Sequence, residues 1–193
     1  MLFLHFSFRF AFKGNTFGVE EAKRTIAINL TGTVQLTNRM IPLMKNRPQG
    51  ARIIDVASRA GKLGQLSSEL QAAFSAGDQT YEGITKLTDS FVNAIASGKH
   101  KEEGWSNSMY GISKLALIAH SYVLARTLAP FNIAVSSMCP GYCQTDMTSQ
   151  KGFKSAEEGA DTIVWLATSH KPASNGFYGE RRPLDWKDPT WES

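Results

Sequence analysis

The stretch ARIIDVAS, at residues 51–58, decides the fold class of this chain. It is a short apolar run bounded by Gly50 and by polar residues, and its adjacent Ile53 and Ile54 are typical of a strand that is covered on both faces. The stretch therefore predicts a central strand of a parallel sheet.

Helical and strand patterns alternate on both sides of this stretch. Residues 18–45 place apolar side chains at helical spacing, and residues 133–141 (IAVSSMCPG) repeat the pattern of an apolar strand. Ser155 and Glu158 then form a capping box that opens a helix, and residues 176–182 (GFYGERR) indicate a last strand. Strands separated by helices predict a parallel α/β sheet with right-handed crossovers.

A helical insertion is expected over about residues 59–105. Two segments in it have helical character, and the second, TYEGITKLTDSFVNAIASG, places apolar side chains such as Ile84, Phe91 and Ile95 on one face. The next helix lies within GWSNSMYGISKLALIAHSYVLA at residues 104–125, where Lys114 is the one side chain with a formal charge.

Composition narrows the function classes. The chain has 193 residues, 42% hydrophobic and 20% charged, with a net charge of +4, which favours one soluble domain over residues 1–193. Its basic residues are scattered, so we expect no nucleic-acid partner, and no apolar run is long enough to predict a membrane span. Cys139 and Cys143 have neither zinc-ligand nor disulfide-framework spacing, which favours a reducing, cytoplasmic location. The first twelve residues, MLFLHFSFRFAF, alternate like a strand and lack the features of a signal peptide.

Tyr110 and Lys114 form the first candidate catalytic pair. Positions four apart lie on one helix face, and an ammonium beside a phenol favours the phenolate, which lowers the pKa of the tyrosine toward neutral pH. The alternative is that Lys114 extends to the surface while Tyr110 belongs to the core.

Two strand ends supply further polar groups. Ser58 ends the stretch ARIIDVAS, and Pro140 and Gly141 follow the next strand, where open α/β sheets bind their ligands. A helix cap at Ser58 and a simple turn at Pro140-Gly141 are the alternatives.

These residues together resemble the short-chain dehydrogenases/reductases. Asn29 in NLTGT, Ser58 in IIDVASRAG, Tyr110 and Lys114 in YGISK, and the segment PGYCQT are similar to that family's Asn-Ser-Tyr-Lys tetrad and Pro-Gly motif. The long spacing between Ser58 and Tyr110, and the segment KEEGWSNSMYG, resemble the carbonyl reductase branch. The similarity extends over about residues 11–186 and implies a Rossmann-like doubly wound parallel sheet.

The resemblance implies NADPH-dependent reduction of a ketone, aldehyde or quinone. Tyr110 would donate a proton to the carbonyl oxygen, Lys114 would lower its pKa and bind the nicotinamide ribose, Ser58 would hold the carbonyl oxygen, and Asn29 would position a water. For Asn29, a polar position at a helix kink is the alternative.

Residues near these four are given secondary roles by the resemblance. The cofactor would also be flanked by four residues at and just beyond the end of the segment 133–141: Pro140, Gly141, Tyr142 and Thr145. Trp105 would line the substrate side, with core packing as its alternative.

The chain departs from the family at its N-terminus. It holds neither the T-G-x-x-x-G-x-G turn nor the N-N-A-G segment, so we expect an N-terminally truncated sheet that lacks roughly 60–90 residues. Two hypotheses follow: a carbonyl reductase, or a catalytically inactive homologue that acts through protein association. For a complete version, the resemblance implies a monomer whose insertion helix covers the surface that other members use to pair.

Overall fold

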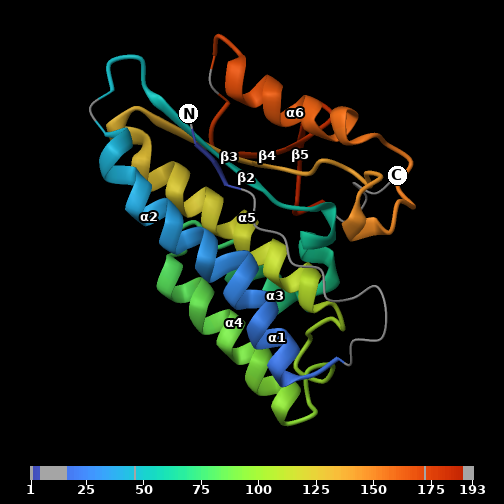
Figure 1. The fold of residues 1–193 in the computed structure, drawn as a ribbon. Helices are drawn as coiled ribbons and strands as arrows, with labels where there is room; N and C mark the ends of the chain where they lie inside the picture. The colour runs from blue at the N-terminus through green and yellow to red at the C-terminus, as the bar shows by residue number, and fades with distance from the viewer. Residues whose placement is uncertain (1, 5–16, 46, 172, 189–193) are drawn as a thin grey trace.

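The computed structural model describes residues 2–4, 17–45, 47–171 and 173–188. Within these residues one five-stranded sheet runs in the order β1-β2-β3-β4-β5 (Figure 1). Its strands are β1 (Leu2–Leu4), β2 (Ala51–Val56), β3 (Ile133–Met138), β4 (Gly176–Gly179) and β5 (Arg182–Leu184). The first four strands pair in parallel and β5 pairs antiparallel to β4, so the expectation of a central parallel strand at residues 51–58 is confirmed.

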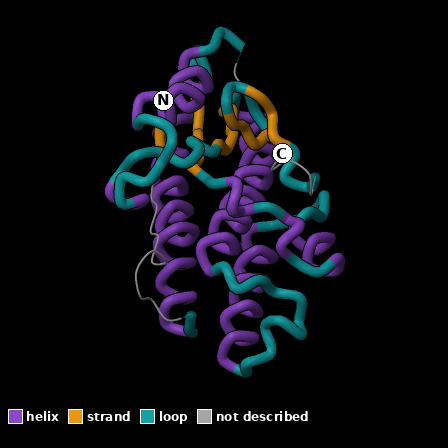
Figure 2. Tube along the Cα trace, turned by 90° about the vertical axis from the view of Figure 1, so that its right-hand side faces the viewer, coloured by secondary structure: helices purple, strands orange, loops and turns teal. Residues whose placement is uncertain are grey.

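Helices cover both faces of the sheet. Their bounds are α1 Val19–Ile26, α2 Thr33–Met44, α3 Ser68–Phe74, α4 Tyr81–Ala96, α5 Met109–Leu128 and α6 Ala156–Thr168. In Figure 1 α6 lies on one side of the sheet, while α1, α2 and α5 lie on the other with α4 outermost. Figure 2 shows the same separation from the side, with the long helices extending away from the strands. The doubly wound arrangement is therefore present, and none of the described helices is long and apolar enough to cross a membrane.

The core is centred on α5. All residues from Gly111 to Ser121 are buried, because α5 packs against β3 on one side and against α1 and α4 on the others. A helix that is apolar all round is expected to be enclosed on all sides, and that is what the run of residues 104–125 produces. The insertion helix α4 therefore covers the outer surface of α5, with the Tyr81 ring 5.4 Å from the His120 ring.

Several local expectations are confirmed and others need correction. The capping box of Ser155 and Glu158 opens α6 as expected. The last strand was expected to be continuous, but it divides into β4 and β5 because Glu180 and Arg181 turn the chain with φ values of 53° and 58°. The helix at residues 18–45 is continuous through a π-helical segment, Ala27–Gly32. Of the strand expected in the first twelve residues, Leu2–Leu4 is present as β1, and residues 5–12 lie outside the described residues.

Candidate active site

Lys114 is enclosed in the core. Its side chain is 0% exposed, and Nζ donates a hydrogen bond of 2.8 Å to the carbonyl oxygen of Val56, the last residue of β2. The ammonium lies 5.7 Å from the centre of the Tyr110 ring, one turn earlier on α5, and Tyr110 itself is half-buried. The alternative in which Lys114 extends to the surface is therefore wrong, and the two side chains form the juxtaposition that their spacing predicts.

Burial controls the charge state of this lysine. Removal from water lowers the pKa of Lys114 to about 8, although Asp55 and Cys139 act in the opposite direction. Burial raises the pKa of Asp55 to about 6, opposed by the Ser121 hydroxyl and by Lys114. The two shifts bring the pKa values of Asp55 and Lys114 closer together, and the Lys114 amine lies beside the Tyr110 phenol.

Asn29 lies in the π-helical segment that packs against α5. Its side chain is 0% exposed, and Nδ2 donates a 2.9 Å hydrogen bond to Ser113 Oγ, which in turn donates to the Tyr110 carbonyl oxygen at 2.8 Å. A single π turn inside a helix frequently marks a functional position, since it displaces a side chain from the regular face. Asn29 is thereby connected by hydrogen bonds to the turn of α5 that carries Tyr110 and Lys114. It lies both at an irregular point of its own helix and beside the candidate site, so the two interpretations of Asn29 do not exclude each other.

Ser58 lies two residues beyond β2, in a turn that packs on α5. Its Oγ accepts a hydrogen bond of 3.2 Å from Ala60 N, as a helix cap would, and the hydroxyl hydrogen remains a donor. Gly61 brings this turn into contact with the helix backbone, since a Cβ there would lie 2.7 Å from Leu115 N. The carboxyl ends of β2 and β3 are also joined, because Ala57 N donates to the Met138 carbonyl oxygen at 2.7 Å.

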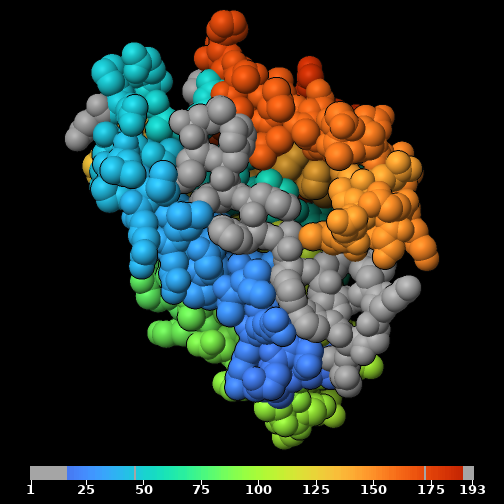
Figure 3. Space-filling view, viewed as in Figure 1, coloured from blue at the N-terminus to red at the C-terminus, as the bar shows by residue number. Residues whose placement is uncertain are grey.

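The loop after β3 contains four residues that were expected to flank the cofactor: Pro140, Gly141, Tyr142 and Thr145. Cys139, at its start, influences the pKa of Lys114, and Gly141 adopts a φ of 86°. Thr145 and Thr148 form a reciprocal capping box, so Thr145 has the structural role of a turn. The Tyr142 ring lies 6.0 Å from the Phe153 ring on the far limb of the loop. Figure 3 shows this loop and α6 on the same face of the molecule as α1 and α2.

Trp105 belongs to the core. It is 4% exposed and packs with its ring 5.3 Å from that of Phe91 and 6.2 Å from that of Phe74. A ring enclosed in this way has little surface left for a substrate, so the structure favours the packing alternative.

Sequence reasoning missed three polar residues around the site. Ser113 links Asn29 to α5, Gln65 donates to the Ala60 carbonyl oxygen at 2.9 Å and accepts from Ser106, and Asp55 accepts from Ser121. The position of Ser113 inside YGISK and of Asp55 inside an apolar strand were available signals. Gln65 carried none, because its partners, the Ala60 carbonyl oxygen and the Ser106 hydroxyl, are brought together only by the fold.

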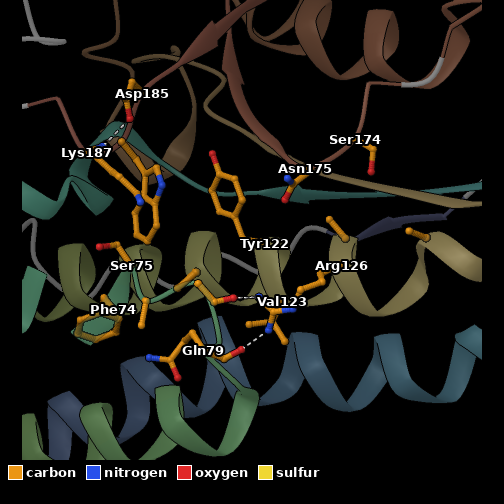
Figure 4. A pocket seen from close by; sticks show the side chains of 16 residues that line it. Phe74, Ser75, Gln79, Tyr122, Val123, Arg126, Ser174, Asn175, Asp185 and Lys187 are labelled. Atoms are coloured by element: carbon orange, nitrogen blue, oxygen red, sulfur yellow. Dashed lines mark hydrogen bonds between the residues drawn. The ribbon is translucent and has the colours of Figure 1, made fainter. Parts of the chain in front are cut away.

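A cavity lies away from this group of residues. It has a volume of about 540 Å³ and is lined by the turn between α3 and α4, one face of α5 and the segment after β5. Figure 4 shows Arg126 of α5 reaching that turn, where its guanidinium donates to the carbonyl oxygens of Gly77 and Gln79. None of Asn29, Ser58, Tyr110 and Lys114 lines this cavity.

Comparison with known proteins accounts for this arrangement. A family model described as short chain dehydrogenase matches residues 13–91 and 84–156. The chain belongs to the short-chain dehydrogenase family. Among curated proteins, carbonyl reductase [NADPH] 1 of Sus scrofa is 35% identical over 178 residues, which cover 88% of this chain and 61% of that protein. The Mus musculus protein of the same name is 37% identical over 83% of this chain and 58% of its own length.

Solved structures agree with the family assignment. Salutaridine reductase from Papaver somniferum is 29% identical, with a TM-score of 0.76 over 83% of this chain and 55% of that one. This short-chain dehydrogenase thus spans about 61% of the length of the Sus scrofa relative that it matches.

Proposed function

We propose that this chain carries the active-site part of an NADPH-dependent carbonyl reductase, which reduces ketones, aldehydes or quinones to alcohols. The observation that supports it best is the enclosed Lys114 ammonium, which bonds the last carbonyl of β2 and lies 5.7 Å from the ring of the half-buried Tyr110. The names of the relatives, carbonyl reductase [NADPH] 1, supply the cofactor and the substrate class.

Each residue of the tetrad has a defined task in this proposal. The Tyr110 hydroxyl donates a proton to the carbonyl oxygen, and the Lys114 ammonium stabilises the phenolate that remains. Ser58, oriented by Ala60 N, donates its hydroxyl hydrogen to the same oxygen. Asn29 fixes the turn of α5 through Ser113, so that Tyr110 keeps its position relative to the ammonium.

The residues present fit one half of the cofactor. Lys114 and Tyr110 would hold the nicotinamide ribose, and the backbone of Pro140 and Gly141, where φ is 86°, would flank the ring. Tyr142 and Thr145 of the same loop would lie beside this half, and Thr145 would do so from the turn that it forms with Thr148. NADPH supplies the hydride when it is bound. The Gly-rich turn that cradles the diphosphate is absent from the sequence.

The test is carbonyl turnover with a matched variant. Purified chain is incubated with NADPH and menadione, and NADPH oxidation is followed by absorbance at neutral pH. The same assay is run on this chain joined to an N-terminal segment that supplies the Gly-rich turn. Turnover in the joined protein that disappears with Tyr110→Phe supports the proposal. Equal turnover in the joined wild-type protein and in its Tyr110→Phe variant would reject the tetrad assignment.

The proposal extends to the organisation of the molecule. We propose one partial domain over residues 1–193, with the insertion at about 59–105, that remains monomeric when complete. The packing of α4 on α5 supports this, because it covers the helix surface that could otherwise pair with a second copy. A stable dimer of the joined protein in sedimentation would contradict it. The free thiols of Cys139 and Cys143 are compatible with a cytoplasmic location.

Association is the second candidate function. β1 is the first strand of the sheet order, and no other described strand pairs with its outer edge. An open parallel edge offers unpaired backbone groups to another chain. Under this candidate the chain would form a complex without turnover, and the tetrad variants would leave that complex intact.

A further inference from the structure

A buried carboxylate lies beneath the candidate site and has no task in the proposed reaction. Asp55 is 0% exposed in β2, and its Oδ2 accepts a 2.7 Å hydrogen bond from Ser121 Oγ of α5. Its Oδ1 is also buried and has no hydrogen-bond partner within the described residues. A carboxylate in such a place is costly unless an opposite charge compensates it.

Lys114 is in the right place to be that opposite charge. Ser121 follows Lys114 by seven residues, two turns of α5, so the two side chains leave the helix on the same face. Lys114 Nζ donates to the carbonyl oxygen of Val56, which is the neighbour of Asp55 on β2. Both charges are therefore held in the layer between β2 and α5, away from water.

Few other groups can titrate in this layer. The Tyr110 ring of α5 lies 5.7 Å from the ammonium, and Cys139, directly after β3, acts on the same lysine. Ser137 of β3, in register with Asp55, is buried and uncharged. His120 follows on α5, but its ring packs against Tyr81 of α4, and burial lowers its pKa to about 4, so it is neutral. Among the described residues, Asp55 is thus the buried carboxylate that shares this layer with Lys114.

We propose that Asp55 is a positioning residue: it is the buried counter-charge that keeps Lys114 an ammonium beside Tyr110 at neutral pH. The pairing rests on the packing of β2 against α5, whereas its use in catalysis rests on the proposed function. The directions of the two pKa shifts agree with the pairing, since each charge opposes the effect of burial on the other.

The pairing is tested by titrating the lysine directly. The chain is produced with [¹³Cε]-lysine, the Lys114 signal is assigned with Lys114→Arg, and its chemical shift is followed with pH. The wild-type signal is expected to titrate at about 8. In Asp55→Asn the midpoint should fall by about one pH unit or more, because an opposing charge has been removed. Asp89→Asn, which removes an exposed carboxylate of α4, is the matched control and should leave the midpoint unchanged.

Reciprocity provides a second arm in case Asp55→Asn does not fold. Labelled aspartate is followed in Lys114→Met, where the pKa of Asp55 should rise further above its wild-type value, since the coupling acts equally on both groups. An unchanged lysine midpoint in folded Asp55→Asn, or an unchanged Asp55 midpoint in Lys114→Met, would overturn the inference. Neither readout uses NADPH or turnover. A failed reductase assay with shifted midpoints would therefore reject the proposed function and leave the pairing standing.

Discussion

At the scale of single residues, Tyr110 is the side chain on which turnover should depend most. Phenylalanine retains the packing of the ring and removes the hydroxyl that donates the proton. We expect Tyr110→Phe to reduce kcat by about a hundredfold or more, in the range typical of a lost general acid. Steady-state reduction of menadione by the protein joined to a Gly-rich segment is the measurement, with circular dichroism to establish that the variant is folded.

Lys114 should set the alkaline limit of the same reaction. Its pKa of about 8 means that the ammonium is lost as pH rises through that value, and the phenolate then loses its stabilising charge. We expect kcat to fall above about pH 8, and Lys114→Met to be nearly as damaging as Tyr110→Phe at pH 7. A kcat that stays constant to pH 10 would contradict this role.

Asp55 should make folding stability depend on pH. Its pKa is raised from 3.8 to about 6 in the folded chain, so its favourable contribution is complete below the unfolded value and is lost as pH rises through about 6. A shift of this size corresponds to at most about 3 kcal/mol. Asp55→Asn does not ionise, so its free energy of unfolding relative to wild type should increase by up to about 3 kcal/mol between pH 4 and pH 7.5.

Urea unfolding of the wild type and of Asp55→Asn at pH 4 and pH 7.5 measures this difference. The other carboxyl groups contribute equally to the two proteins, so their effects on the free energy of unfolding cancel. Ser137→Ala, which changes an uncharged neighbour in register with Asp55, serves as the control. A difference that does not vary with pH would show that Asp55 is not ionised at neutral pH.

The juxtaposition of Tyr110 and Lys114 could be predicted from the sequence, whereas most of the polar groups around it could not. Tyr110 and Lys114 are related by helical spacing alone, so their juxtaposition follows from one element. Asp55 shares a buried layer with Lys114 only because β2 packs on α5, and its place in an apolar strand is compatible with several pairings. The contacts of Gln65 depend on the course of the insertion, which no local pattern specifies.

At the scale of elements, Gly61 fixes how the Ser58 turn meets α5. A Cβ at this position would lie 2.7 Å from Leu115 N and 2.8 Å from the Lys114 carbonyl carbon, both of which are backbone atoms that cannot rotate away. We expect Gly61→Ala to lower the free energy of unfolding by about 1–3 kcal/mol through overpacking. Gly77→Ala is the matched control, since a Cβ there meets nothing within 4 Å. Chemical denaturation of the two variants provides the comparison, and equal stabilities would show that the turn can withdraw from α5.

Element types were predictable where one strong local signal was present. The capping box at Ser155 and the apolar run of ARIIDVAS gave correct elements because their signals are local. The division between β4 and β5 was missed, since Glu180 and Arg181 adopt positive φ without the glycine that usually announces such a turn. The π-helical segment likewise follows from packing on α5 and leaves no mark on the helical periodicity.

At the scale of the whole molecule, the 193-residue chain alone should bind NADPH very weakly or not at all. A dinucleotide is held largely by its diphosphate on a Gly-rich turn and by an adenosine pocket at the ends of the first strands. The sequence contains no such turn, and β1, which extends the sheet beside β2, brings none. Losing even about 4 kcal/mol of contacts weakens affinity by roughly a thousandfold.

Calorimetric titration with NADPH and, separately, with reduced nicotinamide mononucleotide tests this directly. If only the nicotinamide side is recognised, through Lys114, Tyr110 and the loop from Pro140 to Thr145, the two ligands should bind with similar, weak affinities. Restoring a Gly-rich segment should strengthen NADPH binding by orders of magnitude and leave the mononucleotide nearly unchanged, because only the dinucleotide reaches the added contacts. Micromolar NADPH binding by the chain alone, accompanied by carbonyl turnover, would show instead that these residues suffice for the whole cofactor.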